Sequence, residues 1–313
     1  MSDRILEYLV GALVLLIVAW LVARVVSGLG GEAESAPFDL ASLSDAEIDS
    51  VVIASSEGVI HLVASDAWTV NGYDATAEAG ATLTRALGQA RTGNLVGRNP
   101  ENHARLGVTE AAGRTVTVYP AGSSPVSFIV GEQTQVLNQS YVRQPEEDEV
   151  YTLQGSLVTL VSRGPDDWRD KGILQAARED IQRLEYDYPD ESFALELAPT
   201  GWTIEPSGTA ADPASVNNTL SQLARLRAIG FAADSVIPTL TWDSLTAKLR
   251  VLGPGDFVLG ELMFKKREEE QGVGFYIRRV GSPVVYTLST FSGDQILKRA
   301  SAFVGEAEDE ISG

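Results

Sequence analysis

The chain lacks cysteine altogether and has only two histidines among its 313 residues. Without thiols there is no disulfide, no thiolate metal site, no thiol nucleophile and no lipid-modified N-terminal cysteine. Two histidines are also too few for a histidine-rich metal centre. The sequence therefore excludes cysteine chemistry and the commonest zinc sites before any pattern is considered.

Positive charge is scarce as well. Lysine and arginine together number 24, against 43 aspartates and glutamates, which gives a formal net charge of −19. A body this acidic repels a phosphate backbone, and no basic stripe offsets it, so we expect no nucleic-acid partner. Apolar residues make up 44% and charged residues 21%, as in globular proteins, and the length suits two ordinary domains.

Charge is missing from one long stretch near the N-terminus. Residues 5–26 read ILEYLVGALVLLIVAWLVARVV, and the run from Tyr8 to Ala23 holds no charged side chain. As a helix this segment spans roughly 33 Å, close to the hydrocarbon thickness of a bilayer. Tyr8 and Trp20 lie near its ends, where interfacial aromatic residues are common. We therefore expect a transmembrane anchor over residues 1–27 that contacts membrane lipid through residues 5–26.

A buried core helix and a cleaved signal peptide are the alternatives to an anchor. A helix that packs on the core of a small domain usually keeps one polar face toward solvent, whereas this segment is apolar on every side. The apolar stretch is longer than the core of a signal peptide, and the small residues Ala33 and Ala36 precede Pro37, a poor cleavage context. We favour an uncleaved anchor, followed by a flexible tether over residues 28–49, with the bulk of the chain outside the cytoplasm.

The rest of the chain contains an internal repeat. Short motifs of the first half recur in the same order about 135 residues later. The matched segments are 67–70 (AWTV) with 201–204 (GWTI), 131–132 with 260–261 (both GE), 141–143 (YVR) with 276–278 (YIR), and 150–153 with 285–288 (both VYTL). Such a shared order indicates a duplicated unit whose copies differ in loop length.

Each copy reads as a set of strands around one main helix. In the first copy, an apolar stripe that includes Leu83 and Leu87 predicts a helix over 77–91, closed by Thr92-Gly93. In the second copy, Asp212-Pro213 begins a helix that runs to about residue 226. Alternating apolar residues predict strands over 50–55, 58–65, 68–71, 114–119, 126–133, 140–144 and 150–154, then over 180–188, 192–198, 202–205, 247–252, 257–264, 274–280 and 284–289.

The predicted fold class is α+β. An N-terminal transmembrane helix is followed by two tandem repeated units, each an antiparallel sheet with one main packed helix. The first unit spans residues 50–172, with residues 164–172 as the link to the second unit over 173–304. A further helix is expected over 291–303, and an acidic tail occupies residues 305–313.

His61 is the first candidate for chemistry. It lies in the predicted strand over 58–65, on the face opposite Ile60 and Leu62. A histidine there can act as a general base or as the partner of a nucleophile. The sequence contains no G-x-S-x-G elbow, P-loop or dinucleotide fingerprint to accompany it. We therefore interpret His61 as a polar residue on the solvated face of a half-buried sheet.

His103 is the second candidate, in the turn-rich passage 99–107 beside Glu101. An acid–base group there requires distant carboxylates to meet it through folding, so we favour a structural role. Acidic runs at 146–149 and 268–270 fall where hairpin tips are expected, and we interpret both as solvated edges.

Asp166, Asp167 and Asp170 form the densest cluster of carboxylates in the linking segment. Three such groups can bind a divalent cation through oxygen. Arg169 and Lys171 lie among them and would compete for the same carboxylates, so a structural joint is favoured. We predict no catalytic, cofactor-binding or metal-binding residue, and no cofactor.

Large aromatic residues recur at matching places of the two copies. The pairs are Trp68 with Trp202, Tyr141 with Tyr276, and Tyr151 with Tyr286. Residues that recur at equivalent positions of two copies usually serve the packing of each unit. We therefore favour a role as packing anchors for these aromatic residues over the alternative, a peptide- or glycan-stacking surface.

The pattern resembles a bacterial family known as domain of unknown function 4340. The motifs that carry the resemblance are 68–70 (WTV), the helix over 77–91, Asn99-Pro100, 106–108 (LGV), 128–132 (FIVGE), 141–143 (YVR), 150–151 (VY) and 168–171 (WRDK). The family often has an aromatic-Gly-Leu sequence where this chain has Leu106-Gly107-Val108. The resemblance covers residues 50–303, and it implies an extracytoplasmic accessory protein of a gliding-motility-type ABC transporter. It offers no catalytic residues.

The leading functional hypothesis is a non-enzymatic, single-pass protein of the bacterial inner membrane. It would act as an accessory or binding component beside transporter subunits, namely a permease and ATPase complex. The alternatives are a structural scaffold of an envelope complex and a carboxylate-dependent envelope hydrolase, which requires two carboxyl groups roughly 5 to 9.5 Å apart across a cleft.

Overall fold

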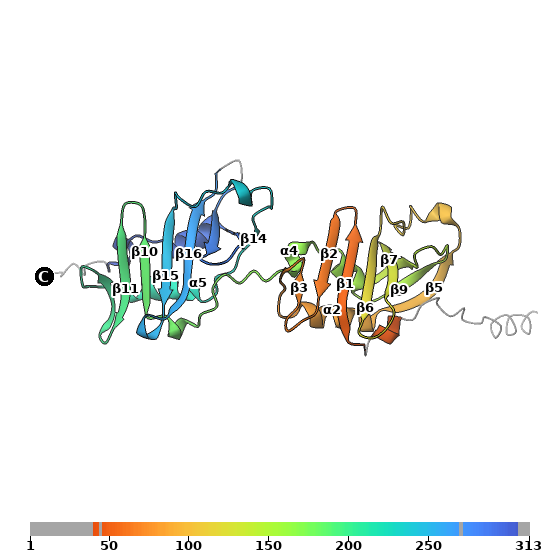
Figure 1. The fold of residues 1–313 in the computed structure, drawn as a ribbon, viewed down its shortest axis with the longest axis horizontal. Helices are drawn as coiled ribbons and strands as arrows, with labels where there is room; N and C mark the ends of the chain where they lie inside the picture. Colours follow the sequence, from red (N-terminus) through yellow and green to blue (C-terminus); the bar gives the residue numbers. More distant parts are fainter. Residues whose placement is uncertain (1–39, 44–45, 269–271, 306–313) are drawn as a thin grey trace, which may run out of the picture. The chain divides into compact units, whose positions relative to one another are not determined.

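The computed structural model describes residues 40–43, 46–268 and 272–305, which form two compact units (Figure 1). The first unit ends at Trp168 and the second begins at Arg169, within the segment predicted as a link. The predicted anchor and residues 306–313 of the predicted tail lie outside the described residues. Within the described part of the chain, no helix is both long and apolar enough to cross a membrane.

The first unit is built on one antiparallel sheet. Its nine strands follow the order β4-β3-β2-β1-β6-β7-β8-β9-β5. Their bounds are β1 Ile48–Ser55, β2 Gly58–Val63, β3 Thr69–Val70, β4 Tyr73–Asp74, β5 Arg91–Gly97, β6 Arg114–Pro120, β7 Val126–Gln133, β8 Gln139–Arg143 and β9 Val150–Gln154.

The second unit repeats this sheet with the same topology. Its nine strands follow the order β13-β12-β11-β10-β15-β16-β17-β18-β14, so each label is that of the first sheet plus nine. Their bounds are β10 Arg183–Asp187, β11 Ser192–Ala198, β12 Gly201–Glu205, β13 Thr209–Ala210, β14 Gly230–Phe231, β15 Ala247–Leu252, β16 Val258–Lys266, β17 Phe275–Arg279 and β18 Tyr286–Leu288.

The register at the centre of the two sheets is also the same. Each central inward-facing residue pairs with one on either neighbouring strand, and the equivalent residues are Val51 and Leu184, Leu62 and Leu195, and Val118 and Val251. Two copies of one unit are expected to share their sheet topology and their central strand register, and these two units share both. This equivalence allows each outward-facing position of one unit to be compared with its counterpart in the other.

Helices cover one face of each sheet. In the first unit these are α2 (Ala79–Gln89) and α3 (Leu157–Val161), followed by α4 (Pro165–Trp168); in the second they are α5 (Pro213–Leu223) and α6 (Thr290–Ile296). The buried stripe of α2 packs with inward-facing strand residues in one apolar cluster, and α5 and α6 contribute to a second. Each main helix has 11 residues, too few to be stable alone, so packing on the sheet holds it in place.

The helix of the second unit starts at a defined cap. Asp212 has an extended backbone, and its side chain accepts a hydrogen bond from the Ser215 backbone N–H at 2.7 Å. Pro213 occupies the first helical position, where its missing N–H is harmless. The predicted start of this helix is confirmed, and its end at Leu223 comes about three residues earlier than expected.

The main difference from expectation lies just after α2. The helix ends at Gln89, and Ala90 already has extended torsions of φ −64° and ψ 131°. The segment predicted as a helix end and turn is strand β5, which pairs with β9 far along the sequence. Register shifts interrupt that pairing at two places, so the strand has no regular alternation that a local pattern could reveal.

The last predicted helix is also divided. Residues 290–296 form α6, and a separate 3-10 turn, Ala300–Phe303, follows it. Leu297 has a ψ of 62°, which is incompatible with a continuing helix. Phe303 is nevertheless fully buried in the second core. The apolar pattern of this segment therefore predicted its burial, although the helix is interrupted.

Candidate functional site

A loop covers part of the sheet face that lies opposite the helices, called the outer face below. In the first unit Leu106 and Val108 pack on Tyr141 and Val150 in a small separate cluster. Their neighbours in β8 and β9 point into the main core, so this cluster lies on the outer face. In the second unit the equivalent cluster contains Ala232, Tyr276 and Val285, with partly buried Val236, Ile237, Leu240 and Trp242 around it.

Two equivalent arginines hold these loops. Arg143, 9% exposed, donates from Nε to the Val108 carbonyl at 2.9 Å and from Nη1 to the Glu147 carbonyl at 2.8 Å. The guanidinium of Arg278 instead lies over the ring of Trp242, 4.5 Å from its centroid. The same position therefore secures the loop by hydrogen bonds in one unit and by a cation–π contact in the other.

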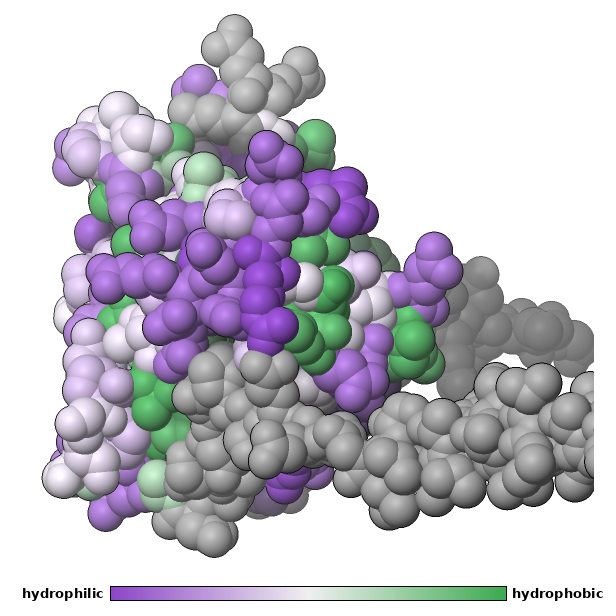
Figure 2. Space-filling model, turned by 90° about the vertical axis from the view of Figure 1, so that its right-hand side faces the viewer, coloured by the Kyte–Doolittle hydropathy of each residue, from purple (hydrophilic) through white to green (hydrophobic). Residues whose placement is uncertain are grey.

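The remaining outer face is open, and its chemistry differs between the units. In the view of Figure 2, hydrophilic residues cover most of the described surface and hydrophobic residues form smaller areas. Single exposed apolar side chains are ordinary on protein surfaces. A connected row of charges across four strands is less ordinary, and the second unit carries one. We take this row as the candidate site.

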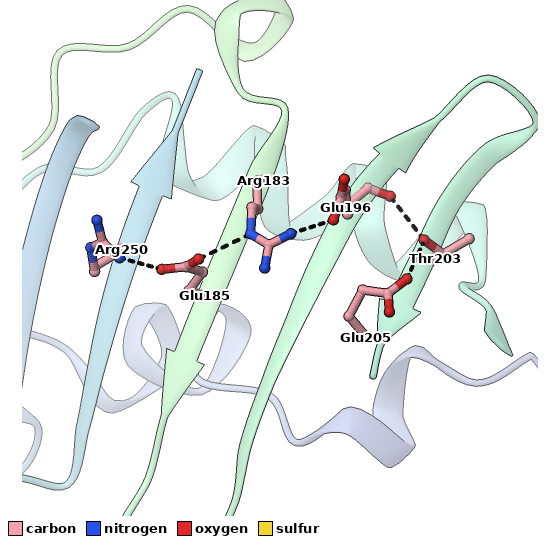
Figure 3. Close-up of polar contacts among 6 residues, drawn as sticks. All are labelled: Arg183, Glu185, Glu196, Thr203, Glu205 and Arg250. Carbon is pink, nitrogen blue, oxygen red and sulfur yellow. Dashed lines mark hydrogen bonds and ion pairs between the residues drawn. The ribbon is translucent and has the colours of Figure 1, made fainter. Parts of the chain in front are cut away.

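The row, called the charged ladder below, crosses strands β16, β15, β10 and β11 (Figure 3 shows its central part). Its members are Glu261, Lys248, Arg250, Glu185, Arg183 and Glu196. They occupy alternate, outward-facing positions of neighbouring strands, because successive side chains of a strand point to opposite faces.

Ion pairs join the ladder from end to end. Arg250 Nη1 donates to Glu185 Oε2 at 2.5 Å, and Arg183 Nε donates to Glu185 Oε1 at 3.0 Å, so Glu185 bridges two guanidinium groups. Arg183 Nη1 also donates to Glu196. At the other end Lys248 Nζ lies 2.5 Å from Glu261 Oε1.

The ion pairs of the ladder stabilise the charged form of Arg183. Burial works against the charge of Arg183, but its hydrogen bond to Glu185 and the charge of Glu196 outweigh it and raise the pKa of Arg183. Such a row presents fixed charges and acceptors, and it suits recognition better than proton transfer.

The equivalent positions of the first unit carry no charge. Counterparts of the ladder are Ser50 for Arg183, Val52 for Glu185, Val63 for Glu196, Thr115 for Lys248, Thr117 for Arg250 and Ser127 for Glu261. The predicted match of residues 131–132 with 260–261 was wrong, because Glu261 pairs with Arg250 as Ser127 pairs with Thr117. Where Arg250 pairs with Glu261, the first unit has a hydroxyl–hydroxyl bond of 2.9 Å between Thr117 and Ser127. The same sheet thus forms without the ladder, so the ladder is not a requirement of the fold.

A hollow of about 470 Å³ opens beside the ladder, over β10, β11, β12 and β15. Its lining includes Glu185, Asp187, Ala194, Glu205 and Pro206. Ala194 pairs in register with Glu185 on one side and Glu205 on the other, and its short side chain leaves room between theirs. His61 holds the equivalent position in the first unit, so the hollow arises where the second copy has a small residue.

The two histidines belong to the first unit. His61 is exposed on β2, with Ile60 and Leu62 buried on the other face, as the alternation predicts. His103 is 7% exposed, and its Nε2 lies 3.0 Å from the Asp148 carbonyl oxygen, a bond that links the loop to the β8–β9 connection. This contact gives His103 a structural role in the loop.

The three aspartates predicted to form a joint have local partners. Asp167 accepts a hydrogen bond from the Gly164 N–H at 3.2 Å, and Asp170 accepts one from the Gly172 N–H at 2.9 Å. Among residues 40–43, 46–268 and 272–305, no group of three or more histidine or carboxylate side chains is placed to hold a metal ion.

The paired aromatic residues pack in the two units. Trp68 and Trp202 are partly buried against the main clusters of their own units, as is Tyr286, while Tyr151 lies within the first core. Tyr141 and Tyr276 support the outer-face loops. All six thus contribute to packing.

Sequence reasoning missed the charged ladder. A signal was present, because residues 183–187 (RLEYD) and 247–252 (AKLRVL) alternate charged and apolar side chains, whereas the counterpart 50–54 (SVVIA) does not. Comparing the outward-facing positions of the two copies would have found it. That comparison needs the register of each strand, which the short matched motifs do not provide.

The geometry therefore defines a duplicated sheet-and-helix protein in which only the second copy has a charged outer face. The family model described as Domain of unknown function (DUF4340) matches residues 68–244, more than half of the chain, and the protein belongs to this family. The match begins before β3 and ends before β15, so it spans parts of both units. Comparison with curated proteins and with solved structures gave no match.

Proposed function

We propose that the protein is a non-enzymatic, single-pass membrane-anchored extracytoplasmic accessory or binding component of an ABC-type transporter complex, associated with its assembled permease and ATPase. The apolar segment 5–26 supports an anchor, and its length matches a bilayer. Membership of the DUF4340 family supports the transporter association through the resemblance described above.

The observation that carries a binding role is the difference between the two outer faces. A duplicated unit folds with neutral residues at these positions in one copy and with a connected ladder of charges in the other. Charges that the fold does not require, arranged in a fixed row on an open sheet face, are suited to an oriented contact with another molecule.

The same geometry disfavours the hydrolase alternative. A glycosidase needs one carboxyl group that keeps its proton near neutral pH. Both oxygens of Glu185, which lines the hollow, accept hydrogen bonds from arginine side chains, so neither oxygen is placed to donate a proton to a leaving group. A purified full chain that hydrolyses glycosides, with loss of activity in Glu185→Gln, would overturn the non-enzymatic proposal.

Reciprocal purification from native membranes tests the transporter association. The full chain, tagged at its C-terminus and extracted in mild detergent, is expected to carry the permease and ATPase of one transporter in near-stoichiometric amounts. A tagged permease is expected to carry the chain in return. Recovery of the chain alone by both routes would contradict the proposal.

A matched variant separates the anchor from the body. In this variant residues 5–26 are replaced by an unrelated apolar span of the same length. Continued recovery of both subunits is expected, because the proposal places the specific contact in the folded units. Loss of the subunits with an intact, membrane-bound body would contradict that placement.

A further inference from the structure

The hollow over Ala194 contains two carboxylates beyond those of the charged ladder. Asp187 accepts a hydrogen bond from Ser192 Oγ at 2.8 Å, and Glu205 accepts a weak one from Thr203 Oγ1 at 3.5 Å. Among the residues that the structure describes, no lysine or arginine forms an ion pair with either carboxylate.

Arg183, Lys248 and Arg250 also line the hollow, and each is already engaged by a carboxylate of the charged ladder. Arg183 is directed to Glu185 and Glu196, and Lys248 is directed to Glu261. Arg250 contacts Glu185 and Glu261. The three cations and three carboxylates of the charged ladder balance, so Asp187 and Glu205, on opposite sides of β11, add two negative charges that no ladder cation is paired with.

The floor between these carboxylates is apolar. Ala194 is 6% exposed, and the Pro206 ring adds an apolar wall next to Glu205. An apolar floor under two carboxylates fits a cation carried on an aliphatic stem. Lysine and arginine side chains have this form, because they pack their methylene groups on apolar surface while the charged end meets acceptors.

The first unit has none of these features at the equivalent positions. Ala54, His61 and Asn71 stand where the second unit has Asp187, Ala194 and Glu205. The Asn71 side chain accepts a hydrogen bond from the His61 backbone N–H at 2.8 Å. The hollow and its two carboxylates are thus particular to the second copy and not required by the shared fold.

We propose that this hollow binds a lysine or arginine side chain of a partner protein, with Asp187 and Glu205 as the acceptors and Ala194 as the floor. The inference rests on the proposed function, since it specifies the chemistry by which the chain contacts a transporter subunit. The partner segment is basic, and its contact weakens with salt because the two carboxylates are at the surface.

Methyl NMR of the full chain in detergent micelles, labelled at alanine methyl groups, tests the site directly. The probe is a capped pentapeptide, Gly-Gly-Arg-Gly-Gly, and the control peptide has citrulline in place of arginine. The arginine peptide is expected to shift the Ala194 methyl resonance saturably, and the citrulline peptide is not. Equal shifts with both peptides, or shifts confined to other alanines, would overturn the proposal.

Charge-neutral variants identify the acceptors. Asp187→Asn and Glu205→Gln are each expected to weaken peptide binding about two- to fivefold, the effect of losing one exposed ion pair. Asp49→Asn removes the same charge from the first unit and is expected to leave binding unchanged. Wild-type affinity in both Asp187→Asn and Glu205→Gln, with unchanged circular dichroism, would overturn the assignment.

Ala194→His introduces the residue that stands at the equivalent position of the first unit, and it tests whether the hollow is the contact with the transporter. It is expected to abolish peptide binding and recovery of the permease and ATPase together. Recovery that is unchanged in Ala194→His would overturn this inference and leave the proposed function standing. If the wild-type chain binds the peptide but recovers neither subunit, the transporter association is refuted and the cation site stands.

Discussion

Replacing the charged ladder by the residues of the first unit should cost little stability. The variant combines Arg183→Ser, Glu185→Val, Glu196→Val and Arg250→Thr, each taken from the equivalent position of the first sheet. The side chains removed are between 29% and 48% exposed, so their ion pairs are solvent-screened.

The magnitude follows from the pairs that are lost. Exposed pairs of this kind contribute about 0.2 to 1 kcal/mol each. Valine and threonine suit a half-buried strand better than the residues they replace, on a scale of about 1 kcal/mol, and offset part of the loss. We expect a net decrease of about 1 to 2 kcal/mol in the free energy of unfolding, smaller still at high salt because salt screens the wild-type pairs.

Urea denaturation of the full chain in detergent, followed by circular dichroism at two salt concentrations, measures this change. Leu184→Ala is the matched control, since Leu184 lies on the same strand but is fully buried on the inner face. That substitution should cost about 2 to 5 kcal/mol. A ladder variant as unstable as Leu184→Ala would show that the charges maintain the fold and would refute the argument for recognition.

Three further predictions concern packing, the loops and a helix cap. Gly80→Ala should lower stability by about 1 to 3 kcal/mol in thermal denaturation, because an added Cβ would lie 2.0 Å from the Trp68 indole nitrogen; an unchanged melting temperature would contradict this contact. Arg143→Met should lower the free energy of unfolding by about 2 to 4 kcal/mol, because it leaves buried carbonyl groups unpaired. Arg278→Met should lower it by only about 1 kcal/mol, because it removes one cation–π contact. Equal losses of stability in urea titrations would argue against these two mechanisms. Hydrogen bonding to the Ser215 backbone N–H lowers the pKa of the Asp212 cap from its ordinary value, so its stabilising effect is present above the unfolded-state pKa and is lost as pH falls through the folded-state pKa. The stability difference from Asp212→Asn should therefore shrink in acid, and a constant difference across pH would contradict it.

Much of the fold was predictable where the signal was local. The helix around Leu83 and Leu87 and the capped helix after Asp212 follow from side-chain period and capping chemistry. Strand β5 was not predictable, because its backbone pairs only with β9 and its irregular register leaves no alternation in the sequence. The interruption of the last helix at Leu297 likewise has no local breaker residue to announce it.

The candidate site was less accessible to sequence reasoning than the fold. Histidines drew attention because their chemistry is distinctive, yet His61 is an exposed residue of the first sheet and His103 supports a loop. Arg183 and Glu185 look like ordinary surface charges in the sequence. Only the pairing of β10 with β11 and β15 shows that they belong to one connected row.

The sequence by itself determined the absence of thiol chemistry, the acidity, the apolar N-terminal stretch and the duplication, because each depends only on composition or on order along the chain. The tertiary structure decided which strands are neighbours, and hence that the two copies share one sheet topology but differ in their outer faces. The physical reason is that strand pairing is non-local. A hollow over Ala194 between Asp187 and Glu205 exists only once three strands lie side by side in one register.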